Sequence, residues 1–379
     1  MTEIESSYRD VRRGPRLIHI IGANGWGDPW RHALDVCRHF RDRGWSVTAY
    51  TRDAKVVDSR FRDAGIDVRH CPLRGMFDVY SALQLARDLR HEARGTVVHV
   101  HRYRDAFAVL LARKLAGRGD IRVVSTRHKL KRGLRHALAR RIYRNLDAQI
   151  FVSESVRDRF FATWSEGRYP FSVERTHVLI PTVNVGLTEA SAEPERGPKV
   201  VLYKGVLEPG RGLETLIDAM TQLRGRKTRL WIVGEGDTDY IDTLRRRAQV
   251  RDVMDLIDWK LRYGDSGSVI DACHVGVDPA LTEVALGPSH IEYMARGRAQ
   301  VLSSAVSCPD CVGDGVEVLV VPRGDASALG EALLSLVSDD ELRAGMGATA
   351  RASYLDNFSW DECVAKLEGI YCSIINYYS

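Results

Sequence analysis

Residues 279–295 of this chain read PALTEVALGPSHIEYMA, and this stretch says most about the fold and the chemistry. It places two carboxylates, Glu283 and Glu292, across a Gly-Pro-Ser turn, and the second falls in the first turn of an apparent helix over residues 291–296. Helix N-termini collect anions, because their N–H groups and dipole point at the ligand. Carboxylates beside such a turn accept hydrogen bonds from sugar or ribose hydroxyls. Phosphate on N–H groups with hydroxyls on carboxylates describes a nucleotide-sugar site.

Upstream of this stretch, strand-like and helix-like runs alternate. Short apolar runs predict strands, and apolar residues that recur every three or four positions predict helices. The expected strands of the first half cover residues 17–22, 46–50, a segment near 68, 97–100, 123–126 and 148–153, and the expected helices cover 30–43, 57–64 and 80–92. Strict alternation predicts an α/β fold, in which helices wrap a parallel sheet in the doubly wound manner.

The alternation breaks at residues 184–198, where Ser, Ala, Glu and Pro predict a linker. It restarts with expected strands at 199–203, 229–234, 275–277 and 299–302 and expected helices at 213–223 and 240–249. The sequence therefore predicts two doubly wound Rossmann-like domains, residues 1–183 and residues 199–358.

The stretch at 279–295 resembles the E-x7-E region of the family 4 retaining glycosyltransferases, which have the GT-B fold of two Rossmann-like domains facing a central cleft. The residues that fall in register with this family are Gly287, Glu292, Met294, Ala295 and Gly297. Glu283 stands one residue farther upstream, which a one-residue insertion explains. The resemblance covers nearly the whole chain. It implies that residues 359–379 form a C-terminal helix that crosses back to the first domain, and that the ligand lies at the C-terminal edges of the two sheets.

A second motif follows the first expected strand of the second half. Residues 205–212, GVLEPGRG, resemble the family's Gly-Arg-Leu-x-Pro-x-Lys-Gly loop, whose cations clamp the donor diphosphate. Arg211 takes the Lys position and keeps a cation there, whereas Val206 takes the Arg position. Lys204, two residues earlier, either supplies the missing charge or is a solvated lysine at a strand end. Gly234 begins a Gly-Glu-Gly-Asp turn that resembles the family's next glycine turn.

The first half offers residues for the acceptor side. Residues 22–28 form a Gly-rich loop after the first strand, which lets backbone approach a ligand. The loop lacks the G-x-G-x-x-G spacing, so it does not indicate NAD, and the family's loop at this place faces the reacting sugar and the acceptor. His101 and His128 end two expected strands, like the family's His-x-His and Thr-x-His elements. The acceptor-side candidates are Asn24, Gly25, Gly27 and His101, and His128 is the candidate that stabilises the reacting sugar or the acceptor.

The resemblance also assigns roles on the donor side. Glu292 would bind the donor ribose, and Glu283 a hydroxyl of the donor sugar. Arg211, with Lys204, would bind the diphosphate. The backbone N–H groups at the start of the helix would point to the same diphosphate, and these belong to Gly287, Pro288 and Ser289. Charge stabilisation of the leaving diphosphate is the main catalytic contribution of such a site.

The histidine clusters at strand ends could suggest zinc, but no carboxylate or Cys completes a ligand set in the sequence. Cys308 and Cys311 form a lone C-x2-C, for which thiols are a better interpretation than a metal site. We therefore expect no metal and no cofactor, with a nucleotide-diphosphate sugar as co-substrate.

The resemblance implies a metal-independent, retaining glycosyltransferase of the hexosyltransferase type, in bacterial glycan, glycolipid or glycoconjugate biosynthesis. Two alternatives stay open. One is a non-catalytic partner subunit that binds nucleotide sugars on the same fold, which Val206 and the shifted Glu283 motivate. The other is a GT-B-like sugar-nucleotide epimerase, for which the sequence shows no convergent acid and base carboxylates.

Composition and charge bound the partners. The chain has 379 residues, 44% of them apolar and 28% charged, which is ordinary for a soluble protein of two domains. A polar N-terminus, dispersed cysteines and the lack of a long apolar run predict a cytoplasmic protein, with attachment to the inner face of the cell membrane as an option. Residues 1–183 hold 35 Lys and Arg against 20 Asp and Glu, a net charge of +15. This excess predicts an anionic, glycan or lipid-linked acceptor, with no nucleic acid, or simply a solvated basic surface.

Residues 127–144 carry much of that charge. Leu130, Leu134, Leu138 and Ile142 recur every four residues among lysines and arginines. This spacing predicts a basic amphipathic helix that could lie on an anionic membrane surface. The alternative is that its apolar face packs on the domain core while the basic face is solvated.

Overall fold

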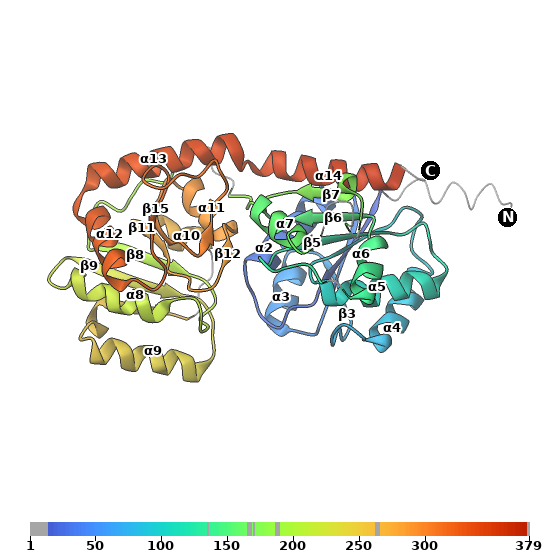
Figure 1. Cartoon of the computed structure of the whole chain (residues 1–379), viewed down its shortest axis with the longest axis horizontal. Helices are drawn as coiled ribbons and strands as arrows, with labels where there is room; N and C mark the ends of the chain where they lie inside the picture. Colours follow the sequence, from blue (N-terminus) through green and yellow to red (C-terminus); the bar gives the residue numbers. More distant parts are fainter. Residues whose placement is uncertain are drawn as a thin grey trace. The chain divides into compact units, whose positions relative to one another are not determined.

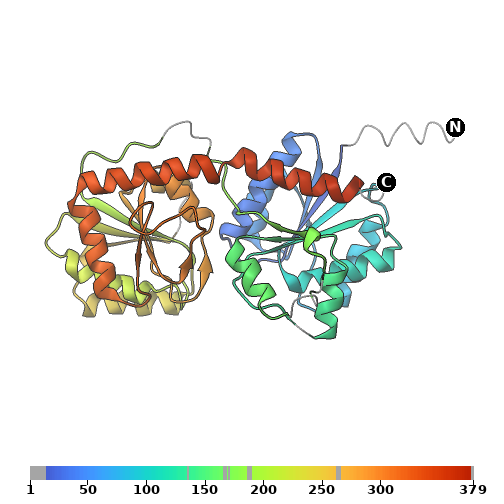
Figure 2. The same cartoon turned by 45° about the horizontal axis from the view of Figure 1, so that its top comes forward.

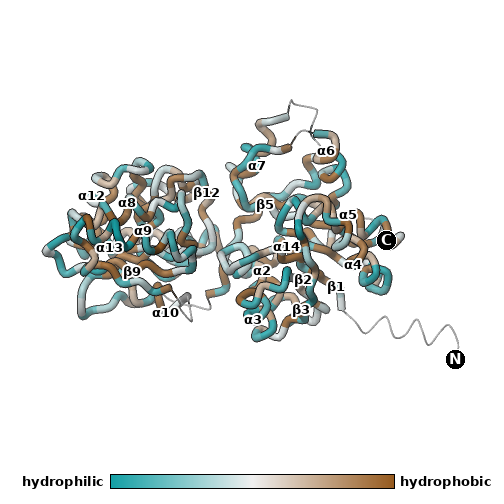
Figure 3. Tube along the Cα trace, turned by 90° about the horizontal axis from the view of Figure 1, so that it is seen from below, coloured by the Kyte–Doolittle hydropathy of each residue, from teal (hydrophilic) through white to brown (hydrophobic). Residues whose placement is uncertain are grey.

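The computed structural model describes residues 14–134, 136–164, 169, 171–185, 190–261 and 266–376. The chain forms two compact units (Figures 1 and 2). The first comprises Met1–Pro181 together with Asp361–Ser379, and the second comprises Thr182–Trp360. Hydrophobic residues concentrate along the strands, as at β9 in Figure 3.

The first unit is built on a parallel sheet of seven strands in the order β3-β2-β1-β4-β5-β6-β7. The strands are β1 (Arg16–Ile21), β2 (Ser46–Thr51), β3 (Asp67–His70), β4 (Val97–Val100), β5 (Arg122–Arg127), β6 (Ala148–Phe151) and β7 (Thr176–Val178). Its helices are α2 (Asp28–Asp42), α3 (Lys55–Asp63), α4 (Val79–Leu89), α5 (Tyr103–Ala116), α6 (Ala137–Arg144), α7 (Glu154–Phe161), the 3-10 turn η1 (Val173–Arg175) and α14 (Trp360–Asn376). The strand order is that of a doubly wound fold, as the alternation predicted.

The second unit repeats this plan with a parallel sheet in the order β10-β9-β8-β11-β13-β15. The strands are β8 (Lys199–Lys204), β9 (Thr228–Val233), β10 (Ile257–Lys260), β11 (Val275–Asp278), β13 (Ala299–Ser303) and β15 (Leu319–Val321), with β12 (Val284–Ala285) and β14 (Val306–Ser307) paired separately. The helices are α8 (Leu213–Ala219), η2 (Met220–Leu223), α9 (Thr238–Val250), η3 (Met254–Leu256), α10 (Ser266–Asp271), α11 (Pro288–Ala295), α12 (Ala326–Ser338) and α13 (Asp340–Asn357). The core lies between the sheet and the helices that flank it.

Helix α14, at the end of the chain, packs on the first unit. The Tyr371 side chain is fully buried, and its hydroxyl lies 2.6 Å from Nδ1 of His99 on β4. The Tyr371 ring also contacts the Phe40 ring of α2, with centroids 5.3 Å apart. The Cys363 thiol donates to the Ile180 carbonyl. The buried apolar face of α14 therefore attaches the end of the chain to the N-terminal sheet.

The amphipathic helix expected over residues 127–144 is wrong in extent. Among the described residues of this stretch only α6 (Ala137–Arg144) is helical, and residues 128–134 are irregular; Arg135 lies outside the described residues. The Arg127 side chain donates to the carbonyls of Lys131 and Arg132, which fixes a loop instead of a helix. Within α6, Ile142 faces the core, and the arginines are exposed. The four-residue spacing of apolar residues predicted too long a helix, because two of its four members, Leu130 and Leu134, lie in the loop before α6.

Candidate functional site

The donor-side candidates follow three neighbouring strands of the second unit. Lys204 ends β8, Gly234 follows β9, and the segment 279–283 follows β11. Strands β9, β8 and β11 are adjacent and parallel, so their carboxyl ends meet at one edge of the sheet. This edge is where doubly wound folds bind ligands.

Two glycines let the loops of this edge pack closely. Gly212 has φ +73°, and a Cβ there would lie 1.9 Å from the Pro279 carbonyl oxygen. Gly234 has φ +152°, and a Cβ there would lie 1.8 Å from the Gly205 carbonyl oxygen. Larger side chains would force these loops apart. The close approach of the two loop backbones therefore explains why position 234 requires a glycine.

Lys204 and Glu292 form a buried ion pair. Nζ of Lys204 lies 3.3 Å from Oε2 of Glu292, and their side chains are 3% and 0% exposed. Nε of Arg296 lies 3.8 Å from Oε1 of Glu292, and the Arg296 guanidinium also reaches Asp271 at 2.5 Å. The solvated form of Lys204 that the sequence left open is therefore wrong. The lysine charge faces the carboxylate that was expected to bind ribose.

Helix α11 begins three residues earlier than expected. It starts at Pro288, which suits the first position of a helix because the ring fixes φ and no N–H is needed there. Glu292 consequently lies in the second turn, so its expected place in the first turn is wrong. The expected set of three N–H groups is also wrong. Pro288 has no N–H, and the Gly287 N–H donates to Nδ1 of His290 at 3.0 Å, which leaves Ser289 from that set.

Asp278 and His290 form a pair that the sequence analysis missed. Because Nδ1 of His290 accepts from Gly287, its Nε2 carries the ring proton and donates to Oδ2 of Asp278 at 3.0 Å. Burial raises the pKa of Asp278, but the bond from His290, the Arg211 charge and the Ala280 N–H together hold that pKa below its usual value. Asp278 thus ties the end of β11 to the start of α11. The Gly-x-x-His spacing of a helix cap was the available signal.

The remaining donor-side candidates lie on the loops. Nε of Arg211 is 3.4 Å from Oε1 of Glu208, and the Arg211 side chain is 29% exposed. Glu283 is exposed just before β12, and Ser289 is buried at the start of α11. The Val206 carbonyl accepts from the Tyr203 hydroxyl at 2.9 Å. Two cations, Lys204 and Arg211, and several carboxylates therefore gather at one sheet edge, and Arg211 is the more exposed of the two cations.

The first unit brings its candidates to the equivalent edge. The loop 22–28 follows β1, His101 follows β4 and His128 follows β5, and these three strands are neighbours in the sheet. Asn24 is exposed and accepts from Nη1 of Arg52 at 2.8 Å. Gly25 is exposed and Gly27 half-buried, where Gly27 precedes the first turn of α2.

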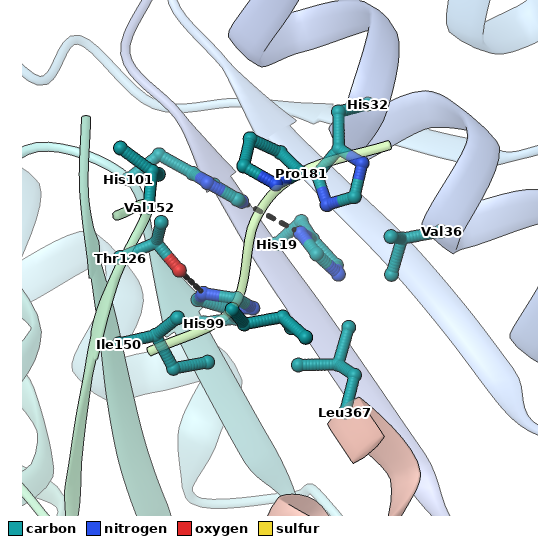
Figure 4. A pocket seen from close by; sticks show the side chains of 11 residues that line it. His19, His32, Val36, His99, His101, Thr126, Ile150, Val152, Pro181 and Leu367 are labelled. Atoms are coloured by element: carbon teal, nitrogen blue, oxygen red, sulfur yellow. Dashed lines mark hydrogen bonds between the residues drawn. The ribbon is translucent and has the colours of Figure 1, made fainter. Parts of the chain in front are cut away.

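Four histidines join into hydrogen-bonded groups near this edge, and Figure 4 shows three of them, His19, His99 and His101. Nδ1 of His19 lies 2.9 Å from Nε2 of His101, and Nδ1 of His101 lies 3.3 Å from Nε2 of His128. His99 instead bonds the hydroxyls of Tyr371 and Thr126, at 2.6 and 2.7 Å. Burial, with the nearby His32 charge, lowers the pKa of His19 and of His128 to about 3. Burial also lowers the pKa values of His99 and His101 well below the usual 6.5, so all four rings are neutral at pH 7.

Two groups in the described residues could in principle hold a metal. One is His19, His99 and His101, and the other is Asp53, Asp58 and His70, of which the first and last are exposed. In the second group the ring nitrogens of His70 already contact both carboxylates, at 3.6 Å for Asp53 and 2.9 Å for Asp58. Cys308 and Cys311 are free thiols, both half-buried.

This arrangement defines the class of protein. Two Rossmann-like units, each built on a parallel doubly wound sheet, are the architecture of the GT-B glycosyltransferases. A solved structure of Alr3699/HepE from Anabaena, in complex with UDP and glucose, superposes with a TM-score of 0.80 at 14% identity, over 95% of this chain and 100% of that one. Sucrose-phosphate synthase from Thermosynechococcus elongatus superposes with a TM-score of 0.72 at 19% identity, over 96% and 100%. At these identities the likeness shows the fold.

Sequence comparisons give the family. Residues 30–178 match the model of Glycosyltransferase Family 4, and residues 198–339 match that of Glycosyl transferases group 1. The chain belongs to the family 4 type of glycosyltransferases, which use nucleotide-sugar donors, and nothing favours the partner-subunit or epimerase alternatives.

Three curated relatives are similar to this chain. A GDP-mannose-dependent alpha-(1-6)-phosphatidylinositol monomannoside mannosyltransferase of Mycolicibacterium smegmatis is 29% identical over 68% of this chain and 71% of that protein. A D-inositol 3-phosphate glycosyltransferase of Xylanimonas cellulosilytica is 25% identical over 95% and 97%. A phosphatidyl-myo-inositol mannosyltransferase of M. smegmatis is 28% identical over 47% of this chain, and the match spans about half of that relative, 46% of its length.

Proposed function

We propose that this chain is a metal-independent, retaining hexosyltransferase that moves a sugar from a nucleotide-diphosphate sugar to a lipid-linked or glycan acceptor in bacterial glycoconjugate biosynthesis. The observation that carries the proposal is the group of Arg211, Glu283 and Glu292 at the carboxyl edge of β8 and β11. The names of the relatives, which act on phosphatidylinositol mannosides or inositol phosphate, support this class of acceptor.

Each donor-side residue has a chemical role in the proposal. Arg211, which solvent reaches, binds the diphosphate and stabilises the negative charge that the leaving group gains. Ser289 offers its N–H at the start of α11, where the helix dipole favours an anion. Glu292 accepts from the ribose hydroxyls, and the ion pair with Lys204 fixes the position of its carboxylate. Glu283 accepts from a hydroxyl of the donor sugar.

The acceptor-side residues supply shape and hydrogen bonds. His128 is neutral because burial lowers its pKa, so it can accept or donate one hydrogen bond to the reacting sugar without adding charge. The exposed Asn24 and Gly25 and the half-buried Gly27 line the loop after β1 that approaches the acceptor. His101 shares a hydrogen bond with His128 on the side of the ring away from the proposed ligand contact.

The test is a transfer reaction. The purified chain is incubated in EDTA with a panel of nucleotide-diphosphate sugars and with bacterial lipid extract, phosphatidylinositol or inositol phosphate as acceptor. Released nucleoside diphosphate is measured, and the anomeric configuration of the product is read by NMR. The proposal expects transfer that EDTA leaves unchanged and a product with the anomeric configuration of the donor. Inversion, or a strict need for a divalent ion, would contradict it.

We also propose attachment to an anionic membrane surface on the cytoplasmic side, through a face of helix α4. None of the helices in the described part of the chain is long and apolar enough to cross a membrane. The large apolar side chains Phe77, Val79, Tyr80 and Leu83 are nevertheless 67%, 50%, 64% and 51% exposed. Phe77, Val79 and Tyr80 line a shallow hollow of about 420 Å³ at the start of α4, and Leu83 lies farther along the same helix. Contiguous exposed apolar side chains of this kind mark interaction surfaces.

The charge around these side chains suits anionic lipid. The exposed cations around this face are Arg74 before α4, Arg87 on α4, Arg90 at its C-terminal cap, and Arg104 and Lys114 on the neighbouring helix α5. The acidic residues of the same two helices and their caps point inward: Asp78 accepts from Ser81, Asp88 from Tyr50, and Asp105 from Arg102. The outer face therefore combines apolar and basic groups with no exposed carboxylate from α4 or α5.

Liposome flotation tests this surface. Changing Phe77 and Leu83 to Ser should weaken binding to vesicles that contain anionic lipid, and changing Arg87 and Arg90 to Gln should make the remaining binding less sensitive to salt. Val250→Ser, which alters an 84% exposed valine of the second unit, is the matched control. A variant in which Lys131 and Arg132 are changed to Gln tests the membrane surface that the sequence suggested, because both residues lie on the irregular segment before α6. Equal binding by all variants would contradict the assignment.

A further inference from the structure

Three imidazoles of the first unit form an unbranched hydrogen-bonded chain. It runs from His128, after β5, through His101, after β4, to His19 on β1. His19 pairs in register with His99 on β4, and His101 lies two residues beyond His99. The rings of His19 and His101 therefore stand on the same face of the sheet. The chain links the residue proposed to touch the reacting sugar to the interior of the unit.

The hydrogen bonds restrict where the protons lie. Each neutral imidazole has one N–H and one acceptor nitrogen. In both bonds of the chain an Nε2 faces an Nδ1, so one of the two atoms must carry the proton. If His128 carries its proton on Nε2, His101 must carry its own on Nε2, and so must His19. If His19 carries its proton on Nδ1, the other two rings must do the same. The three rings therefore share one tautomer.

The shared tautomer decides what His128 offers to a ligand. With all protons on Nε2, the outer Nδ1 of His128 accepts a hydrogen bond. With all protons on Nδ1, the same atom donates one. A sugar hydroxyl that needs a particular partner is therefore sensitive to His19, which lies two rings away from it.

The inner end of the chain opens on a small cavity (Figure 4). Nε2 of His19 is buried and has no hydrogen-bond partner among the described residues. The cavity measures about 10 Å³, and its walls include Val36, Pro181 and Leu367 as well as His32 and Thr126. A cavity of about this size holds one water when polar groups line it. A water beside His19 and His32 would complete the hydrogen bonds of the chain.

We propose that His101 and His19 are positioning residues that fix the tautomer of His128, and that one buried water at Nε2 of His19 closes the chain. This inference rests on the proposed contact between His128 and the sugar only for its catalytic consequence. The tautomer coupling and the water follow from the geometry of the first unit.

A metal ion in this cluster is the competing explanation, and the ring planes disfavour it. An imidazole binds a metal along the lone pair of its nitrogen, in the plane of the ring. The rings of His99 and His101 are stacked, with centroids 4.4 Å apart and planes 23° from parallel. One ion cannot lie close to both planes at bonding distance, about 2.0–2.1 Å for Zn²⁺. His99 is also occupied by the hydroxyls of Tyr371 and Thr126.

NMR of protein with ¹⁵N-labelled histidine tests the proposal without any activity. Two-bond N–H correlations report which nitrogen of each ring carries the proton. We expect His19, His101 and His128 to show the same tautomer, and His101→Leu to change the pattern of His128. His101→Gln, whose amide both donates and accepts, should preserve the pattern and serves if the Leu variant does not fold. Tyr371→Phe, which removes a partner of His99 only, should leave His128 unchanged.

Kinetics then connect the chain to catalysis. His101→Leu should lower kcat by about tenfold, equal to the loss of roughly one hydrogen bond, with the donor KM little changed. His101→Gln should restore most of that loss. Different tautomers in the wild-type rings, an unchanged His128 in His101→Leu, or a spectrum that shifts when Zn²⁺ is added would overturn the proposal. If the wild type transfers no sugar while the spectra behave as expected, the proposed function fails and the coupling stands.

Discussion

The buried pair of Lys204 and Glu292 gives the sharpest stability prediction. Glu292→Gln removes the carboxylate, so the ammonium of a 3% exposed lysine loses its counter-charge, whereas the Arg296 guanidinium keeps Asp271 at 2.5 Å. Breaking a buried pair by removing one partner costs about 3–5 kcal/mol. We expect the lower half of this range, because the Gln oxygen still accepts a hydrogen bond. Lys204→Met should cost less, because Glu292 keeps Arg296 at 3.8 Å. The double variant should cost clearly less than the sum.

The assay is a double-mutant cycle by urea unfolding, supported by thermal melts, in which each kcal/mol corresponds to about 2–4 °C for a unit of this size. A positive coupling of at least about 1 kcal/mol is expected, since the two side chains share one desolvated contact. Additive losses, or a Glu292→Gln variant within about 0.5 kcal/mol of the wild type, would refute the reasoning. Either result would mean that the lysine charge is neutralised or solvated by other groups.

Three further predictions follow from the geometry. Gly212→Ala should destabilise the second unit by more than about 1–2 kcal/mol, because φ is +73° and the new Cβ would overlap the Pro279 carbonyl. Gly225→Ala, at φ +72° in open space, is the control for the effect of φ alone. Equal melting temperatures of the two variants would disprove the overlap. Asp278→Asn should destabilise α11 by about 1–3 kcal/mol, because His290 loses its anionic partner. Faster amide hydrogen exchange at residues 288–295 would show this loss, and unchanged exchange would count against it. The free energy of unfolding should fall as the pH drops from 6.5 toward 3. His19 and His128 have folded pKa values of about 3, so the unfolded chain takes up protons first, and each histidine should lower the free energy of unfolding by up to about 2 kcal/mol at pH 5. A stability profile that is flat from pH 7 to 5 would contradict the neutral state of these rings.

Local patterns were sufficient for the fold. Alternating apolar runs, such as 17–22 followed by the helical spacing from Ala33 to Phe40, correspond to β1 and α2 in a parallel sheet. Such patterns work because burial on one or both faces dictates the residue type at each position. The pattern failed at residues 127–144, where the leucine spacing spans a loop fixed by the Arg127 side chain. Side-chain bonds to loop carbonyls have no periodic signature.

The site was less accessible from the sequence than the fold. The pairing of Lys204 with Glu292 joins residues 88 positions apart, and only the register of β8 beside β11 brings them together. The chain from His128 to His19 depends in the same way on the order β1-β4-β5. The start of α11 could have been predicted, because Pro288 after a glycine is a signal for a first helical position. Long-range pairings need the strand order, which local propensity does not contain.

The central claim is that the carboxyl edge of β8 and β11 binds a nucleotide-diphosphate sugar through Arg211. Calorimetric titration in EDTA tests it most directly, with a panel of nucleotide sugars and the matched nucleoside diphosphates and nucleosides. We expect one nucleotide sugar to bind the wild type. Arg211→Ala should weaken binding of the nucleoside diphosphate by about 1.5–3 kcal/mol while binding of the nucleoside is little affected, and Arg211→Lys should recover part of the loss. Equal losses for diphosphate and nucleoside, or no binding of any nucleotide sugar to the wild type, would contradict it.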